Sequence, residues 1–561
     1  MNVKASPLPL VSFLLSVIVF GALSVYAYNG HGPTLLRWAL PFEYIVLAAA
    51  AVWYLKSGSQ ETASFPSFKP LALGAAAASV LVAAGIGFSF KPTTMLPDES
   101  SYRFQGRLYA AGRLMAEPLP GAAKTNPQTP HYLYFEHHVL APTGWYSKYP
   151  PGWPLVLALG YLLHADWLMN PLLGLLLLYV SAQIALAFFD DRVRWLTVLL
   201  MAISPYFFTQ AYTELSHMLC AVLTAGATLL LIRWIERQKL VFLIAALVCI
   251  GINFQVRPFS ALVVAVGLSI GLLYQHRFQR RLLLIDLLVL LIGGVLTVAA
   301  FLGYQYLYTG HPFLSPYAVS NGRQTPGEMV FGSKYLINGL LRLRPQMQDT
   351  LRAVFPCFGW LLVVGMLNRS RRRSKLPDFA RAVMLLYPLF MLFHLNEPEP
   401  SWGANGERYY FEAYFAMAIL AARGIEELVL RWNAPARRVL VATLACVAVM
   451  IPILAGSALE PLSVTLPYHR MSIALRPLLN AQTHDDIVFL TSSLRFKSHF
   501  FNINAADWRS APVVVLGDPG DKLREKVVRD FGRTHWWVAH YDQDRNEAVV
   551  TEGGAISGSV P

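Results

Sequence analysis

The chain has 561 residues, of which 55% are hydrophobic and only 14% are charged. Soluble proteins carry about 25% charged residues, so this composition excludes an ordinary soluble protein and predicts a polytopic membrane protein. The formal net charge of +13 could by itself indicate nucleic-acid binding. The basic residues gather in short connections between apolar segments, however, and that is the distribution of cytoplasmic loops. We therefore expect a membrane as a partner and no nucleic acid.

The apolar segments predict about 13 transmembrane helices, since a helix needs roughly 18 or more apolar residues to cross a bilayer. In chain order they lie at 8–28, 39–56, 70–90, 153–188, 195–209, 216–234, 240–256, 259–275, 282–305, 350–367, 379–395, 409–429 and 438–457. Within 153–188 we expect a short helix, a break near 166–171 and then a span. The result is an N-terminal transmembrane hairpin, 1–69, and a transmembrane module, 70–457, with a large loop at 91–152.

Basic residues predict the orientation of these helices. If the N-terminus is cytoplasmic and the spans alternate, every cluster of arginine and lysine falls in the cytoplasm. The clusters lie at 192–194, 233–239, 277–281, 369–375 and 437–438. The loops at 91–152, 306–349 and 396–408 and the C-terminal segment 458–561 then face outward. We expect a multi-pass protein of the bacterial inner (plasma) membrane.

The C-terminal segment 458–561 is predicted to be a small external (periplasmic) α/β domain. Its short apolar stretches, bounded by turn residues, are typical of β-strands. The stretches lie at 485–490, 511–517, 535–541 and 546–552, with a helix predicted at 521–531. The strand-to-helix turn before that helix could bind a phosphate. No phosphate-binding motif is present, so an ordinary βα turn is the simpler interpretation.

Two adjacent carboxylates, Asp98 and Glu99, follow the apolar segment 70–90. The residues after them predict an amphipathic helix over 103–115 that lies in the membrane interface. Its apolar stripe consists of Phe104, Leu108, Ala111 and Met115. Asp98 could then serve only as the N-cap of this helix, because an aspartate side chain accepts hydrogen bonds from the first helical N–H groups.

A second distinctive stretch is "KYPPG", which places Lys148 and Tyr149 directly before a membrane helix. Proline is common at helix starts, because its missing N–H would be unpaired there anyway. With its neighbouring aromatic residues, the stretch could therefore be a rigid loop in the aromatic belt of the membrane.

The ordered set of motifs resembles the GT-C-fold glycosyltransferases, polytopic enzymes such as the protein O-mannosyltransferases and the aminoarabinose transferase of lipid A. The acidic pair and the Tyr-Pro-Pro-Gly stretch belong to this set. Its other members are "NFQVRPFSALVV" (253–264), "YLYTGHPFLSPY" (306–317) and "GERYYFEAY" (406–414). The acidic pair follows the third predicted span, where the family commonly has it after the first. The segment 1–69 is therefore interpreted as an added hairpin.

The resemblance implies transfer of a sugar from a polyprenyl-phosphate-linked donor to an acceptor hydroxyl outside the membrane, with inversion. Asp98 would be the catalytic base, with Glu99 as orienter or alternate. Basic side chains would stabilise the phosphate leaving group, and the candidates are Lys148, Arg257 and Arg408. The simpler interpretation of these cations is snorkelling to the membrane interface.

Further polar side chains are candidates for substrate binding: Tyr102, Tyr149, Glu214, His217 and Tyr409. Glu214 and His217 lie three residues apart near an external helix start. They could bind sugar hydroxyls or a metal ion, and capping or packing explains them equally well. Some family members use a divalent ion and others do not. Glu136, His137 and His138 are weak evidence for one, because adjacent residues in a strand point to opposite faces. A divalent metal is left open.

Two other classes of function fit the composition. A transporter or lipid flippase of envelope glycan precursors would also be polytopic, but we find no repeated halves and the acidic residues lie in loops instead of mid-membrane. A catalytically silent binding or assembly protein would use its external C-terminal segment. The sequence does not specify the sugar, and a lipid, a polysaccharide or a protein could be the acceptor.

Overall fold

The computed structural model describes residues 68–90, 94, 96–122, 130–133, 135–322, 376–386, 408–431, 460–481, 486–492, 504 and 507–556. The predicted spans 8–28, 39–56, 350–367 and 438–457 lie outside these residues. The chain divides into two compact units. The first comprises Met1–Gly87, Asn170–Leu296 and Phe331–Pro461, and the second Phe88–Met169, Thr297–Val330 and Leu462–Pro561. Each is described by itself, and the division at 1–69, 70–457 and 458–561 stays a prediction.

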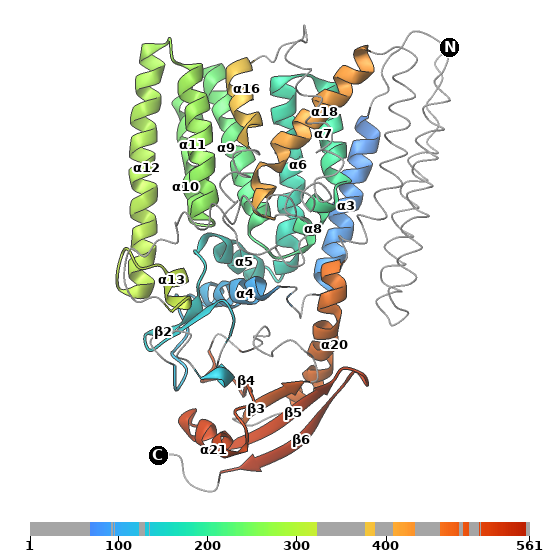
Figure 1. Ribbon diagram of the computed structural model, residues 1–561, viewed down its shortest axis with the longest axis vertical. Helices are drawn as coiled ribbons and strands as arrows, with labels where there is room; N and C mark the ends of the chain where they lie inside the picture. Colours follow the sequence, from blue (N-terminus) through green and yellow to red (C-terminus); the bar gives the residue numbers. More distant parts are fainter. Residues whose placement is uncertain are drawn as a thin grey trace, which may run out of the picture. The chain divides into compact units, whose positions relative to one another are not determined.

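Helices make up the described part of the first unit (Figure 1). In chain order they are α3 (Lys69–Ser89), α6 (Met169–Phe188), α7 (Asp191–Ala202), α8 (Pro205–Tyr212), α9 (His217–Arg237), α10 (Leu240–Phe254), α11 (Pro258–Gln275), α12 (Arg280–Thr309), α16 (Pro377–Met384), the short 3-10 helix η7 (Arg408–Ala413) and α18 (Tyr414–Arg431). The last part of α12 belongs to the second unit.

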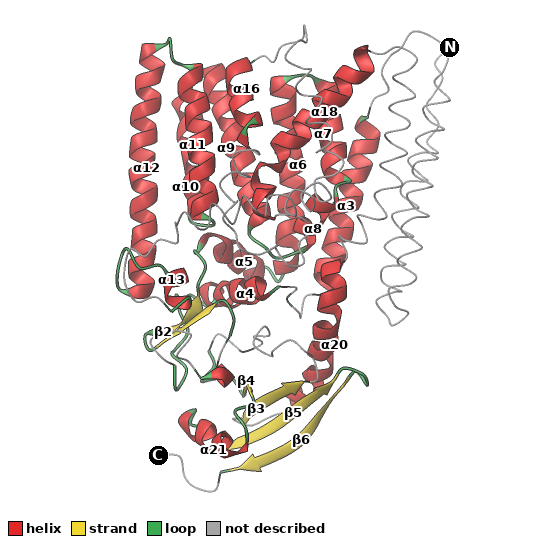
Figure 2. Cartoon of the chain, in the orientation of Figure 1, coloured by secondary structure: helices red, strands yellow, loops and turns green. Residues whose placement is uncertain are grey.

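Because short turns join α9, α10, α11 and α12, each of these helices runs antiparallel to the next (Figure 2). Only Gln238 and Lys239 separate α9 from α10, and α11 and α12 are separated by 276–279. The basic clusters 233–239 and 277–281 therefore lie at one end of these helices. Arg257, in the turn between α10 and α11, lies at the opposite end. This separation is what the positive-inside pattern predicts.

Among the described residues, five helices are long and apolar enough to cross a membrane. They span Lys69–Ser89, Asp166–Phe188, His217–Arg237, Pro258–Gln275 and Arg280–Thr309. The shorter apolar helices Gly152–Leu162 and Leu240–Phe254 add to this pattern. The expected short helix and break before α6 are confirmed. The predicted total of about 13 spans includes segments that lie outside the described residues.

The prediction of one span at 195–209 is wrong. The structure has two shorter helices there, α7 ending at Ala202 and α8 beginning at Pro205. Proline lacks an amide hydrogen and disfavours the helical conformation in the residue before it. Ser204 is accordingly extended, with φ −76° and ψ 128°, and a new helix starts after it.

The second unit is a mixed α/β structure. Its elements are α4 (Pro97–Ala110), the 3-10 helix η3 (His131–Leu133), the hairpin β1 (His138–Ala141) and β2 (Gly144–Ser147), α5 (Gly152–Leu162), the 3-10 helix η4 (Asp166–Leu168), the end of α12, α13 (Pro316–Ser320), α20 (Glu460–Ala481), β3 (Asp486–Ser492), β4 (Val513–Gly517), α21 (Asp521–Asp530), β5 (His535–Asp542) and β6 (Glu547–Ala555). The strands and the helix expected between 485 and 552 are present.

Four described strands form a mixed sheet in the order β4-β3-β5-β6. β3 is parallel to both β4 and β5, while β6 is antiparallel to β5. Alternate residues of the sheet are buried in two different clusters: Ile487 and Phe489 lie in one, and Val488 and Leu490 lie in the other. Both faces of the sheet are therefore covered, as the near-continuous apolar runs of the strands indicate.

The prediction of a helix over 103–115 is wrong in its bounds, because α4 spans Pro97–Ala110 and leaves Ala111 and Met115 beyond its last residue. The two stripe residues within α4 pack against protein, rather than facing lipid. Phe104 and Leu108 are buried in the same cluster as Trp145 of β2 and Phe489 of β3. On another side α4 approaches α5 closely at Gly106, where a β-carbon would lie only 3.1 Å from the Cβ atom of Leu157. The first turn of α4 is thereby fixed in position.

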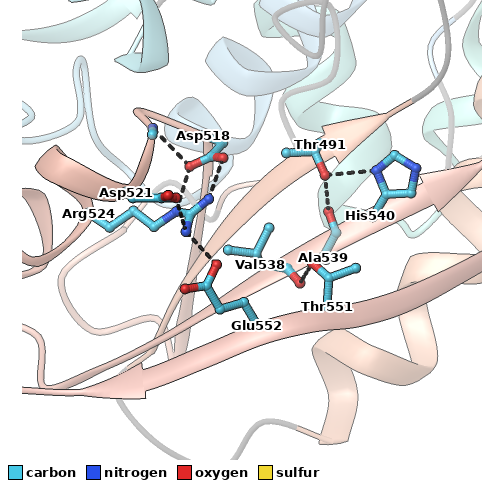
Figure 3. A network of polar contacts seen from close by, with 10 residues as sticks. Thr491, Asp518, Asp521, Arg524, Val538, Ala539, His540, Thr551 and Glu552 are labelled. Atoms are coloured by element: carbon cyan, nitrogen blue, oxygen red, sulfur yellow. Dashed lines mark hydrogen bonds and ion pairs between the residues drawn. The ribbon is translucent and has the colours of Figure 1, made fainter.

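A buried arginine organises the turn between β4 and α21 (Figure 3). Arg524 donates two hydrogen bonds of 2.8 Å to the carboxylate of Asp518, and it pairs with Asp521 at 2.7 Å and Glu552 at 2.6 Å. The hydrogen bonds from Arg524 lower the pKa of Asp518. Two carboxylates at the start of α21 disfavour an anion there, which supports the interpretation as an ordinary βα turn.

Acid should destabilise the second unit through His138. This buried side chain accepts a hydrogen bond of 3.1 Å from the indole of Trp145, and burial lowers its pKa from 6.5 to about 3. The imidazole is neutral in the folded state, so its contribution to stability is complete above pH 6.5 and is lost as the pH falls toward 3. Thermal unfolding in detergent should show this loss, at most about tenfold in the folding equilibrium per pH unit.

The matched variant is His138→Gln, which keeps an acceptor for Trp145 but does not titrate. Its unfolding temperature should depend less steeply on pH in this window. An unchanged slope would contradict the assignment to His138.

Candidate active site

The acidic pair lies in the first turn of α4, where the two carboxylates have different partners. Leu96 is the N-cap and Pro97 is the first helical residue, so the interpretation of Asp98 as the N-cap is wrong. Glu99 supplies the cap interaction instead, because its carboxylate accepts the backbone N–H of Leu96 at 3.3 Å. Glu99 is buried by this arrangement and stabilises the helix start.

Asp98 faces the segment that precedes α5. The hydroxyl of Tyr149 donates a hydrogen bond to Oδ1 of Asp98. The other carboxylate oxygen, Oδ2, lies 3.8 Å from Nε2 of His137. The side chain of Asp98 is 13% exposed, so it is accessible without being fully solvated. A hydrogen bond thus orients Oδ1, and the imidazole of His137 lies near Oδ2.

Tyr149 is fixed at three points. Its backbone carbonyl accepts a hydrogen bond of 3.0 Å from the hydroxyl of Tyr304, and its backbone N–H donates one of 3.2 Å to Oγ of Ser147. Its ring packs against that of Tyr102 with a centroid separation of 4.5 Å. The structure therefore brings Asp98, Tyr102 and Tyr149 together, as three of the predicted site residues.

Lys148 is buried between aromatic rings. Its Nζ lies 5.1 Å from the ring centroid of Tyr149 and 4.4 Å from that of Tyr317. Rings at this distance stabilise a cation without neutralising its charge. Tyr317 was not among the predicted residues, although the quoted segment 306–317 ends on it.

The C-terminal end of α12 contacts the loop that follows α4 in the sequence. The hydroxyl of Tyr308 lies 2.8 Å from that of Tyr109 and donates to the carbonyl of Leu114 at 2.9 Å. Gln105 bonds the same hydroxyl at 3.2 Å and accepts the N–H of Ser147 at 3.0 Å. The contacts of Tyr308 link residues about 200 positions apart in the sequence and were not predicted.

A second polar cluster, in the first unit, is centred on Glu412. Its side chain is 0% exposed, and Oε1 lies 3.1 Å from Nε of Arg257 and 3.4 Å from Nδ1 of His217. Nη1 of Arg257 in turn lies 3.5 Å from Nε2 of His217. The three side chains form a closed ring of polar contacts in which the carboxylate neutralises the guanidinium.

Tyr409 covers this cluster. The guanidinium of Arg257 lies 4.9 Å from its ring centroid, and that of Arg408 lies 5.3 Å from it. Arg408 also contacts the hydroxyl of Tyr409 at 3.4 Å. The edge of His217 meets the same ring at a centroid distance of 5.7 Å.

Glu214 lies in the connection between α8 and α9 and is largely buried. The side-chain amide of Asn170 donates to the carbonyls of Thr213 at 2.5 Å and Leu215 at 2.9 Å, so the backbone is held on both sides of Glu214. The predicted residues thus fall into two groups. Asp98, Glu99, Tyr102, Lys148 and Tyr149 belong to the second unit, and Glu214, His217, Arg257, Arg408 and Tyr409 belong to the first.

Glu412 is the residue that the sequence reasoning missed most plainly. It lies within the quoted motif "GERYYFEAY", of which only the arginine and the first tyrosine were singled out. A carboxylate within an apolar segment indicates a candidate functional residue, because it needs a buried polar partner. Across the part of the chain that the structure describes, no group of three or more His, Cys, Asp or Glu side chains is arranged to hold a metal ion.

Comparison with solved structures identifies the fold. The chain matches ArnT from Cupriavidus metallidurans bound to undecaprenyl phosphate, with a TM-score of 0.51 and 16% identity over 82% of this chain and 92% of that one. It matches the apo state of that protein with a TM-score of 0.50 and 15% identity over 84% and 93% of the two chains. The chain has the GT-C fold.

The expected GT-C fold is thus confirmed at the level of architecture. No protein-family model and no curated protein sequence matches the chain. The roles of the individual residues of this GT-C protein therefore rest on their own geometry.

Removing the charge of Glu412 should destabilise the first unit of this GT-C fold. In Glu412→Gln, the guanidinium of Arg257, which is 19% exposed, loses its buried counter-charge. Breaking one partner of a buried ion pair costs up to about 3–5 kcal/mol, so the unfolding temperature in detergent should fall clearly. The double variant with Arg257→Gln should recover part of the loss. Additive losses from the two changes would show that the pair is not coupled.

Proposed function

We propose that the chain is a membrane glycosyltransferase that transfers a sugar from a polyprenyl-phosphate-linked donor to an acceptor hydroxyl on the external side of the membrane. The observation that carries the proposal is Asp98, a partly accessible carboxylate whose Oδ1 accepts the hydroxyl of Tyr149. The GT-C fold supports it, and the similar ArnT structure has undecaprenyl phosphate bound.

Asp98 is suited to the role of general base. As the acceptor oxygen bonds to the anomeric carbon of the sugar, its proton must leave, and a positioned carboxylate contributes about 10²–10⁴-fold to such a step. The hydrogen bond from Tyr149 orients the carboxylate through Oδ1.

We infer a single displacement with inversion, and the different partners of the two acids support this inference. The acceptor oxygen attacks the anomeric carbon, and the bond from that carbon to the phosphate oxygen breaks. This route needs one carboxylate as base and none as nucleophile. Glu99 accepts the Leu96 N–H and is buried in the helix start, so we assign it the orientation of α4.

The departing phosphate needs positive charge and no general acid. In the second unit we assign this role to Lys148, whose charge is held between two aromatic rings. In the first unit the candidates are Arg257 and Arg408. A guanidinium presents a planar set of donors that suits phosphate oxygens, and the contact with Glu412 holds that of Arg257.

Tyr102 and Tyr149, and separately Glu214, His217 and Tyr409, are proposed to contact the substrates in their own units. The acceptor is a lipid, a polysaccharide or a protein. We place the enzyme in a bacterial inner membrane, with the N-terminus cytoplasmic and the C-terminal segment 458–561 outside, because this orientation puts the basic clusters on the inner side.

Asp98→Asn should abolish transfer without abolishing donor binding. The amide keeps an acceptor for Tyr149 but cannot take the proton, so we expect a loss of about 10²-fold or more. A deletion strain that carries the variant should show the cell-envelope sugar profile of the deletion. The purified variant should bind undecaprenyl phosphate with nearly wild-type affinity.

The matched control is Asp507→Asn. This residue also belongs to the second unit, but it pairs with Arg113 at the surface, 3.3 Å away. It should restore the wild-type sugar profile. Glu99→Gln should lose less activity than Asp98→Asn. Normal sugar transfer by Asp98→Asn would exclude Asp98 as the base, and a transporter would keep its flux in that variant.

A further inference from the structure

His137 has an unusual backbone conformation directly beside Asp98. Its φ is 63°, in the left-handed region that is uncommon for residues other than glycine, although asparagine, aspartate and histidine are enriched there. It is the third residue of a turn closed by the hydrogen bond of 3.2 Å from the N–H of His138 to the carbonyl of Phe135. Turns with positive φ at this position favour glycine or asparagine. A histidine here carries a conformational cost that some other feature must offset.

Contacts from two other elements hold this conformation. The backbone carbonyl of His137 accepts a hydrogen bond of 2.6 Å from Oγ of Ser101 in α4 and one of 3.1 Å from the N–H of Lys148. Both donors belong to segments that carry proposed site residues. The turn is therefore tied to the first two turns of α4 and to the stretch before α5.

The side chain of His137 lies among ionisable groups of the site. Its Nε2 is 3.8 Å from Oδ2 of Asp98 and 3.7 Å from Oε1 of Glu136, and its ring meets that of Tyr149 edge-on at a centroid distance of 5.8 Å. The side chain is 21% exposed, so it is open to solvent on one side. His138, the next residue, is directed to Trp145 instead.

We propose that His137 is a positioning residue for the base, whose imidazole pairs with Oδ2 of Asp98 while Tyr149 holds Oδ1. The two contacts together fix the plane of the carboxylate, which neither contact could do alone. The proposal rests on the proposed role of Asp98 as the base.

A structural role of the backbone alone is the competing explanation, and three substitutions separate the two. Glycine and asparagine both adopt the left-handed conformation readily, so His137→Gly and His137→Asn keep the turn and remove the imidazole. His137→Gln places an amide N–H near the position of Nε2. If the imidazole positions Asp98, the first two variants should lose about 2- to 5-fold in transfer rate, the effect of an ion pair that is longer than a hydrogen bond.

The glutamine variant should recover a large part of that rate. His137→Gly and His137→Asn should unfold at or above the wild-type temperature, because both residues suit the positive φ. All three variants should keep their affinity for undecaprenyl phosphate, because it does not depend on the orientation of the carboxylate. His164→Gly is the matched control: His164 belongs to the same unit, has φ 54° and is exposed. Its change should leave transfer intact. Wild-type transfer rates in His137→Gly and His137→Asn would overturn the proposal.

A second measurement does not need activity and so separates this proposal from the proposed function. Diethyl pyrocarbonate modifies neutral imidazoles, and mass spectrometry can compare the modification rates of His137 and His164 in one sample. Pairing with a carboxylate should slow the reaction of His137. Asp98→Asn should then raise the ratio of the two rates severalfold. An unchanged ratio would exclude the His137–Asp98 pair, whether or not the protein transfers sugar.

Discussion

The stacking of Phe104 on Trp145, with ring centroids 4.2 Å apart, fixes the arrangement of the second unit. It joins α4 to β2, and the same cluster continues into the strands of the C-terminal sheet. Buried aromatic pairs of this kind contribute both area and geometry. Because α4 cannot rotate without exposing Phe104 and Leu108, the acids of its first turn are held in one direction.

The polar contacts around the first turn of α4 depend on this packing. The helix start is stabilised by Glu99, the carboxylate of Asp98 is oriented by Tyr149, and Tyr149 is held by Tyr304 at the end of α12. In the first unit the buried carboxylate of Glu412 determines the arrangement, because it lies among apolar helices. There Glu412 must be neutralised where it is buried, and Arg257 and His217 are drawn to it. Both arrangements confine charged side chains to one geometry, as catalysis requires of groups that act without reorganisation.

Periodicity predicted the elements well, and contacts between distant residues poorly. The strands and α21 followed from short apolar runs between turn residues, and the helices α9 to α12 from their longer apolar runs. The division of 195–209 was missed because apolar composition outweighed Pro205, although proline chemistry predicts it. The choice between the two acids at the start of α4 depended on a one-residue difference in the helix start, which composition does not determine.

The sequence indicated individual residues of the candidate site, but not the contacts between them. Asp98 and Tyr149 are 51 residues apart, and both were selected, but their hydrogen bond requires the position of α5 relative to α4. His217 and Glu412 are 195 residues apart, and only the first was selected. His137 was noticed as a metal candidate because of its neighbours in sequence. Its proposed role rests on the distance from its imidazole to Asp98, which no residue pattern reveals.

The core beneath α4 also imposes an order on the synthesis of the protein. Phe104 and Trp145 are made early, whereas Phe489, Trp508 and Val538 of the same cluster are made near the end of the chain. At about 5–20 residues per second, an interval on the order of tens of seconds separates them. During that time the apolar side of α4 has no partner from the sheet. The nascent chain therefore passes through a stage in which Phe104 can pack only on early partners such as Trp145, before the sheet completes the cluster.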